Sequence, residues 1–235
     1  EKEIERQGLS ILGWRDVPLN PKIVGSIAAT TQPTIRQVFV GKNNIELTES
    51  EFSTKLFVAR KIAENEIHNT ALSQKQYFYF SSLHHRTLIY KGLLIPEDID
   101  RFYLDLSNPK LVTRLALVHQ RFSTNTFPTW DLAQPFRYMC HNGEINTRRG
   151  NVTRMNAREE LMKSDFIGED LLKVFPTILD GKSDSAQMDM VVEILLTTGR
   201  SLPEVMMMMV PEAWEKHKSM SDEKKAFYEF NSCIM

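Results

Sequence analysis

Two short polar segments of the sequence contain the residue types best suited to chemistry, and each is joined to a short run that is expected to be a strand. The first segment, residues 119–128, contains Arg121 and directly follows the apolar run 115–118. The second, residues 140–146, contains Asn142 and Gly143 and closes the run 136–140. Side chains at the ends of buried strands are held firmly and still face solvent, which suits a small-molecule site.

The chemistry of these residues points to recognition of an acid and stabilisation of an oxyanion. The planar guanidinium of Arg121 can bind a carboxylate through two parallel hydrogen bonds. Asn142 and Gly143 can offer a side-chain amide and a backbone N–H side by side, the two donors of an oxyanion hole. Each signal has an ordinary alternative, since an Asn-Gly pair commonly forms a turn and an Arg at a strand end commonly forms a surface ion pair.

Other candidate sites are weaker. The histidines His84, His85 and His119 lack the spacing of metal ligands, so we expect no metal site. The basic run at 148–158 could grip phosphate or RNA, but Glu159 and Glu160 follow it, and a solvated helix face or interdomain ion pairing is favoured. Cys140 is expected to be a small buried apolar residue rather than a nucleophile.

Composition excludes several classes of protein. The 235 residues have a net charge of -1, which gives no general attraction to nucleic acid or to an anionic membrane. The longest apolar run, 205–210, has six residues, far fewer than the ~18 that a membrane span needs. Two distant cysteines suit a reducing compartment.

The hydrophobic patterning predicts an α+β fold. Residues 8–36 are expected to form a loop, 37–40 a strand, and 48–67 a helix opened by the capping box Thr48–Glu51. A hairpin is expected over 77–83 and 87–95, with a short helix opening at 96–98. Further elements are expected as buried strands at 115–118 and 136–140 and as helices at 151–162, 184–198, 203–210 and 221–228.

Three polar motifs occur in a fixed order: Arg-Phe-Ser-Thr-Asn-Thr-x-Pro at 121–128, His-Asn-Gly-Glu-Ile-Asn at 141–146 and Ser-Asp-Ser-Ala at 183–186. Together they resemble the glutaminase domain of class-II glutamine amidotransferases, which have an N-terminal nucleophile. Within that family the chain is most similar to glutamate synthases. The segments that carry this closer similarity are 11–18, 127–135, 199–204 and 206–214.

The resemblance assigns roles to five residues. It implies that Arg121 binds the α-carboxylate of glutamine, that the Thr124 hydroxyl adds a contact, and that Asp184 binds the α-ammonium group. It implies further that Asn142 and Gly143 are the oxyanion donors. From its position alone, Asp184 could instead cap the helix that begins there.

The resemblance also implies a fold and a larger enzyme. The fold would be an αββα sandwich of two antiparallel sheets, and residues 1–235 would be a single partial domain, truncated at both ends. The parent enzyme would hydrolyse L-glutamine and use the ammonia to aminate 2-oxoglutarate reductively, so that glutamate is the product.

The remaining implications concern cofactors, partners and location. The resemblance places FMN and a 3Fe-4S cluster of the parent enzyme outside this segment. The synthase domain of the same polypeptide, and a small reductase subunit or ferredoxin, would be the partners, with neither nucleic acid nor membrane involved. The electron donor (NADPH, NADH or ferredoxin) stays open, and the expected location is the cytoplasm, or the plastid in a plant.

The sequence is also compatible with one alternative. The family's nucleophile is an N-terminal Cys, whereas this sequence begins at Glu1. We therefore expect an interior piece of a longer polypeptide, and the alternative is a non-catalytic module that binds glutamine or another protein.

Residues 1–235 alone are expected to release no glutamate from glutamine, because no N-terminal thiol is present to attack the amide. A coupled assay for glutamate on the purified chain tests this expectation. Measurable release that disappears in the Arg121→Ala variant would contradict it.

Overall fold

A computed structural model of the chain describes residues 1–122, 124, 126–145 and 147–234, with the side chains as far as Ser232. The motif positions Ser123, Asn125 and Asn146 therefore lie outside the described residues. The described part combines helices with one antiparallel sheet, in agreement with the predicted α+β class.

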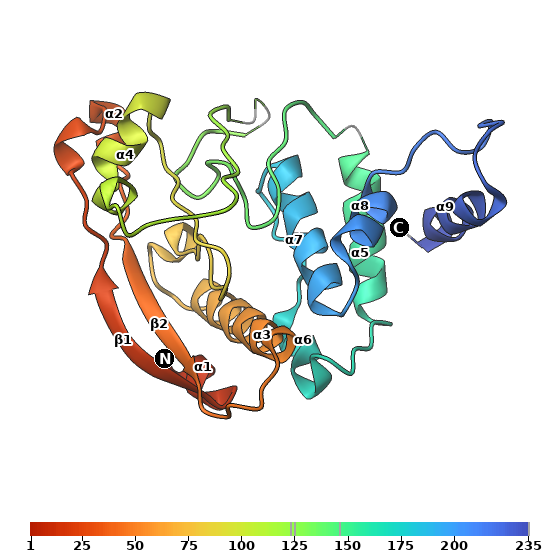
Figure 1. Cartoon of the computed structure of the whole chain (residues 1–235), viewed down its shortest axis with the longest axis horizontal. Helices are drawn as coiled ribbons and strands as arrows, with labels where there is room; N and C mark the ends of the chain where they lie inside the picture. Colours follow the sequence, from red (N-terminus) through yellow and green to blue (C-terminus); the bar gives the residue numbers. More distant parts are fainter. Residues whose placement is uncertain (123, 125, 146, 235) are drawn as a thin grey trace.

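The sheet consists of β1 (Leu9–Asp16) and β2 (Arg36–Lys42), at the left of Figure 1. The expected strand at 37–40 is confirmed as part of β2, whereas the expected loop at 8–36 is wrong over β1 and over the short helix Ser26–Ala29. The glycines that suggested a loop do not prevent pairing, because Gly13 lies beside a bulge in the ladder and takes a φ of +155°, which suits a residue without Cβ.

Helix α3 (Glu49–His68) lies between the sheet and the helices that follow residue 147 (Figure 1). Its first turn has the predicted capping box, in which the Thr48 hydroxyl accepts from the Glu51 N–H and the Glu51 carboxylate accepts from the Thr48 N–H. One face packs Phe52, Leu56 and Ala59 against the sheet and α1 (Lys2–Arg6). The opposite face buries Phe57, Val58 and Ile62 against the later helices.

The later helices form the other half of the molecule (Figure 1), and α7 and α6 both contact α3. The expected helices there are all present, although α5 begins three residues earlier than expected and α9 extends six residues further. The elements are α5 (Arg148–Glu159), α6 (Leu171–Val174), α7 (Asp184–Thr197), α8 (Leu202–Met209) and α9 (Asp222–Ile234). Two short helices, α2 (Ser26–Ala29) and α4 (Ile99–Phe102), complete the α-helices among the described residues.

Five 3-10 turns connect these elements among the described residues. They are Pro21–Ile23, Lys75–Tyr77, Pro96–Asp98, Leu104–Ser107 and Gly168–Asp170. The turn at Pro96–Asp98 runs into α4, so the short helix expected to open at this point is confirmed.

Four expected strands are not strands. Residues 77–83, 87–95, 115–118 and 136–140 have no regular ladder partner among the described residues. In two of the four, charged side chains bond the backbone instead. Phe80 donates its N–H to Glu64, and the Asp189 carboxylate accepts from the N–H groups of Arg137, Tyr138 and Met139 at 3.0, 2.8 and 3.1 Å.

The run 115–118 differs from expectation in burial as well. Leu115 and Val118 are 82% and 80% exposed, although their β-branched and aliphatic pattern is typical of a buried strand. The pattern predicts an apolar face but not its burial. Burial depends on whether another segment packs against that face.

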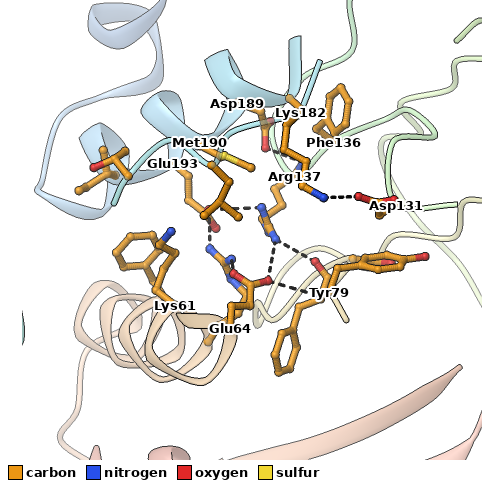
Figure 2. A pocket seen from close by; sticks show the side chains of 18 of the residues that line it. Lys61, Glu64, Tyr79, Asp131, Phe136, Arg137, Lys182, Asp189, Met190 and Glu193 are labelled. Atoms are coloured by element: carbon orange, nitrogen blue, oxygen red, sulfur yellow. Dashed lines mark hydrogen bonds and ion pairs between the residues drawn. The ribbon is translucent and has the colours of Figure 1, made fainter. Parts of the chain in front are cut away.

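A buried network of ion pairs joins α3 to α7 and to residue 137 (Figure 2). The Arg60 guanidinium, 1% exposed, donates to Glu64 at 2.7 Å and to Glu193 of α7 at 2.5 Å. Arg137 approaches the same two carboxylates at 3.4 and 3.6 Å. Burial would raise the pKa of Glu64, but the guanidinium groups of Arg60 and Arg137 outweigh it and hold that pKa below its ordinary value.

The network lines a cavity of about 60 Å³, in which Figure 2 shows Glu64, Arg137 and Glu193 turned toward one another. Its charges come from three separate stretches of chain, so each removed group leaves an opposite charge buried without its full set of partners. Removing one partner of a buried ion pair therefore lowers the free energy of unfolding far more than removing one partner of a surface pair.

We expect Arg60→Met to lower the free energy of unfolding by about 3–5 kcal/mol, because Glu64 and Glu193 would stay buried and share Arg137 alone. Urea unfolding monitored by far-UV circular dichroism measures this change. The control is Arg101→Met, which removes an ion pair with Asp98 from an Arg whose side chain is 63% exposed and should cost less than about 1 kcal/mol. Equal effects of the two substitutions would contradict the prediction.

Candidate active site

Hydrogen bonds bring the three polar motifs together, although they lie far apart in the sequence. His119 Nε2 lies 2.9 Å from the Asn142 side-chain oxygen, and the Thr124 hydroxyl lies 3.3 Å from the Glu144 carboxylate. The backbone N–H of Ile145 donates to Asp184 Oδ2 at 2.8 Å. The loop 141–145 is therefore bonded to residues 119–124 on one side and to the start of α7 on the other.

Asp184 is the first residue of α7 and is 6% exposed. The helix is capped by Ser183, whose hydroxyl accepts from the Ala186 N–H at 3.2 Å, so the alternative role of Asp184 as the cap is wrong. Its carboxylate accepts instead from the N–H groups of Ile145 and Ser185, at 2.8 and 2.7 Å. A carboxylate has about four acceptor positions, so these bonds leave capacity for a cationic ligand, and the positive end of the helix favours the charge.

Asn142 and Gly143 stand on a loop whose backbone requires glycine. Gly143 has a φ of +111°, in the region that side chains with a Cβ rarely adopt. Asn142 is exposed, and its amide oxygen faces His119. An amide oxygen only accepts, so the amide NH₂ of Asn142 remains as a donor that can face a ligand.

Arg121 is exposed, and no carboxylate among the described residues lies within ion-pair distance of its guanidinium. Among the described residues, Arg121 therefore does not form the surface ion pair that was the alternative to a binding role. Its backbone N–H donates to His119 Nδ1 at 3.1 Å, which ties the segment to the ring that also contacts Asn142.

Gln134 hydrogen-bonds the backbone of the first residue of the 141–145 loop, His141. Its side-chain oxygen accepts from the His141 N–H at 2.8 Å, and its amide nitrogen donates to the His141 carbonyl at 3.2 Å. The segment that carries Gln134 is itself anchored, because Lys182 forms an ion pair with Asp131 at 2.5 Å and the indole N–H of buried Trp130 donates to the Ala28 carbonyl at 3.1 Å. The loop is thus fixed at His141 and again at Ile145.

A cavity of about 290 Å³ lies beside Asp184 and Ile145, bounded by α5, α7, α8 and α9. Its size is at the lower end of the range of small-ligand pockets, about 300–1,000 Å³. Arg148, Arg154 and Arg158 of α5 line it, and Arg148 donates to Gln187 at 2.8 Å. The basic run that the sequence indicated as a solvated face therefore lies partly against this cavity.

Sequence reasoning missed the contacts that position the site. The sequence offers His119 only as a weak candidate metal ligand, and Gln134 lies in the segment 127–135, to which the sequence assigns no role. A His two residues before a candidate Arg gave a weak signal, because a short polar side chain can bond the backbone two residues on.

Three further observations bear on chemistry. Cys140 has a free, partly buried thiol. The described residues contain no group of three side chains placed to ligate a metal ion. Among the same residues, no helix has the length and apolar character needed to cross a membrane.

Residues 1–235 match the sequence profile of the class-II glutamine amidotransferases, and the chain belongs to this family. Over 232 residues it is 46% identical to the glutamate synthase [NADPH] large chain of Bacillus subtilis and 47% identical to the glutamate synthase [NADH] of Schizosaccharomyces pombe. It is 40% identical over 233 residues to the ferredoxin-dependent glutamate synthase 1 of Arabidopsis thaliana. The similarity to glutamate synthases indicated by the motifs is thereby confirmed.

The alignments include 98–99% of this chain but a small part of each relative. The chain spans 15% of the Bacillus protein, 11% of the Schizosaccharomyces protein and 14% of the Arabidopsis protein. Most of the length of each relative therefore has no counterpart in these 235 residues.

Lys91 contacts the segment that carries Gln134, and its burial has a measurable consequence. It is 6% exposed, donates to the Asp131 carbonyl at 2.6 Å and lies over the rings of Tyr79 and Phe136. Burial lowers the pKa of Lys91 to about 7, and burial likewise lowers the pKa of Lys61 to about 8. An unfolded lysine keeps its proton to about pH 10.4.

We expect the free energy of unfolding to rise between pH 7 and pH 9. Over this interval the unfolded chain binds more protons at Lys91 and Lys61 than the folded chain, and stability then increases with pH. Urea unfolding at several pH values measures the slope, which Lys91→Met should reduce, leaving the smaller part due to Lys61. A slope unchanged in Lys91→Met would contradict the depressed pKa of Lys91.

Proposed function

We propose that residues 1–235 form part of the glutaminase domain of a glutamate synthase. In the complete polypeptide this domain hydrolyses L-glutamine to glutamate and ammonia. The rest of the polypeptide uses the ammonia to aminate 2-oxoglutarate reductively. The observation that carries the proposal is the junction of the three motifs, in which the 141–145 loop is bonded to both residues 119–124 and Asp184.

The proposed binding mode uses opposite charges for the two ends of the amino acid. Arg121, with no acidic partner among the described residues, binds the α-carboxylate, and the Thr124 hydroxyl adds a contact. Asp184 binds the α-ammonium group with the acceptor positions that Ile145 and Ser185 leave unused. This pair selects a zwitterionic substrate.

The chemical step is acyl transfer at the side-chain amide. The family's N-terminal Cys would attack the amide carbon with its thiol while its own α-amine accepts the thiol proton. That proton would then pass to the amide nitrogen as the C–N bond breaks and ammonia leaves. Water would hydrolyse the resulting thioester, which releases glutamate and the free thiol. The Asn142 amide and the Gly143 N–H stabilise the negative oxygen of the tetrahedral intermediate. Loss of one such donor costs about 2.7–4 kcal/mol of transition-state stabilisation.

We also propose that the complete fold is the αββα sandwich, with residues 1–235 as a single partial domain. The exposed apolar run 115–118 supports it, since a strand with such a face is stable when another strand covers it. The strands that cover it would come from residues outside 1–235.

The remaining assignments follow from the proposed enzyme. FMN and an iron–sulfur cluster are held by parts of the polypeptide outside residues 1–235. The electron donor differs among the relatives, whose names specify NADPH, NADH or ferredoxin. A reductase subunit or ferredoxin would be the partner, and the location would be the cytoplasm, or the plastid in a plant.

We expect Arg121→Ala in the full-length enzyme to raise the KM for glutamine by at least about thirtyfold, because truncating one member of a charge pair costs about 2–5 kcal/mol. Steady-state kinetics with glutamine measures the change. Activity with added ammonia should persist, since ammonia bypasses the glutaminase step.

Arg114→Ala is the matched control, because Arg114 is also exposed and lies seven residues earlier. Its KM for glutamine should equal that of the wild type. A similar rise in KM in both variants, or none in Arg121→Ala, would contradict the role of Arg121.

A further inference from the structure

We infer that His119 is a positioning residue that orients the Asn142 amide toward the oxyanion and holds the backbone of the substrate-binding segment at Arg121. The inference rests on the proposed function, because it concerns the same site. His119 is half-buried and contacts both halves of that site through its two ring nitrogens.

The two contacts define one protonation state of the ring. Asn142 Oδ1 can only accept, so the proton of this 2.9 Å bond is on His119 Nε2. The Arg121 backbone N–H can only donate, so Nδ1, at 3.1 Å, is the acceptor. Both bonds are satisfied by the neutral ring with its proton on Nε2 and by no other form.

The bond to Asn142 has a chemical consequence. A side-chain amide can rotate by half a turn and exchange its oxygen with its NH₂ group. An oxyanion is stabilised by the NH₂ and repelled by the oxygen, so only one of the two orientations assists the reaction. The N–H donor of His119 holds the Asn142 side-chain oxygen facing the imidazole ring. The Asn142 NH₂ group is then free to donate to the oxyanion.

The bond to Arg121 acts on the other half of the site. Nδ1 accepts from the backbone two residues further on, a local contact that stabilises a turn. The Arg121 side chain starts from that turn, so the ring also fixes where the guanidinium begins. A single ring thereby sets the relative position of the carboxylate-binding residue and an oxyanion donor.

Two substitutions separate the contacts. The amide of Asn reaches about as far as Nδ1 of His, and the amide of Gln about as far as Nε2. His119→Asn can keep the bond to the Arg121 N–H and loses the bond to Asn142. His119→Gln can keep a donor to Asn142 and loses the acceptor for Arg121.

In the full-length enzyme, His119→Asn is expected to lower kcat for glutamine by about tenfold to a hundredfold with KM within about twofold of wild type. His119→Gln is expected to raise KM by more than about threefold and to change kcat little. This crossed pattern is the result that supports a positioning role. Equal losses in the two variants, as general loosening would produce, would overturn it.

A double-mutant cycle with Asn142→Ala separates this inference from the proposed function. Asn142→Ala should lower kcat by about 100- to 1,000-fold, and adding His119→Asn should then have no further effect. If Asn142→Ala leaves kcat unchanged, the proposed function of the loop fails. If Asn142→Ala has its effect but His119→Asn does not, or if the two effects multiply, the inference alone is overturned.

Gln120→Ala is the control, because Gln120 is exposed and adjacent to His119. Its kcat and KM should match those of the wild type. Ammonia-dependent activity and the thermal unfolding temperature of each variant are measured in parallel. Wild-type values in these two measurements show that a change in glutamine kinetics arises at the site, and their loss in both His119 variants counts against the inference.

Discussion

The structure depends most on the buried ion pairs of Arg60. Its guanidinium joins Glu64 of α3 to Glu193 of α7, and Arg137 approaches the same carboxylates from a segment without regular structure. Such groups are stable in the interior only while each has its partners, so the spacing of the two helices and the course of residues 136–139 are coupled. A side chain four residues before Glu193, Asp189, completes the arrangement by binding three consecutive N–H groups.

The candidate site is built on this base from loops rather than from strands. Residues 119–124 and 141–145 have no regular ladder among the described residues, so side chains position them. Gln134 binds both backbone groups of His141, Asp184 binds the N–H of Ile145, and His119 joins Asn142 to Arg121. A loop held at both ends by charged or bidentate contacts is rigid enough to present donors in a fixed direction, which oxyanion stabilisation requires.

The longer helices were predictable because their signals are local. The capping box at Thr48, the apolar spacing of Phe52, Leu56 and Ala59, and the start of α7 at Asp184 depend on residues within one or two turns. Four of the five expected strands were wrong, because a strand needs a partner that the local pattern does not identify. Residues 136–140 have a strand-like pattern, yet their N–H groups bond the carboxylate of Asp189, which lies about fifty residues away in the sequence.

The sequence by itself determined the family and the identity of the candidate residues, because the three motifs are specific and need no coordinates to be read. It also determined the longer helices, α3, α5, α7, α8 and α9, whose signals lie within a few residues. The tertiary structure alone decided how those residues meet: that Ser183 rather than Asp184 caps α7, that Asp184 reaches the Asn142 loop, and that His119 contacts both halves of the site. The physical reason is that hydrogen bonds between distant segments depend on the packing of α3 against α7, which no local pattern encodes.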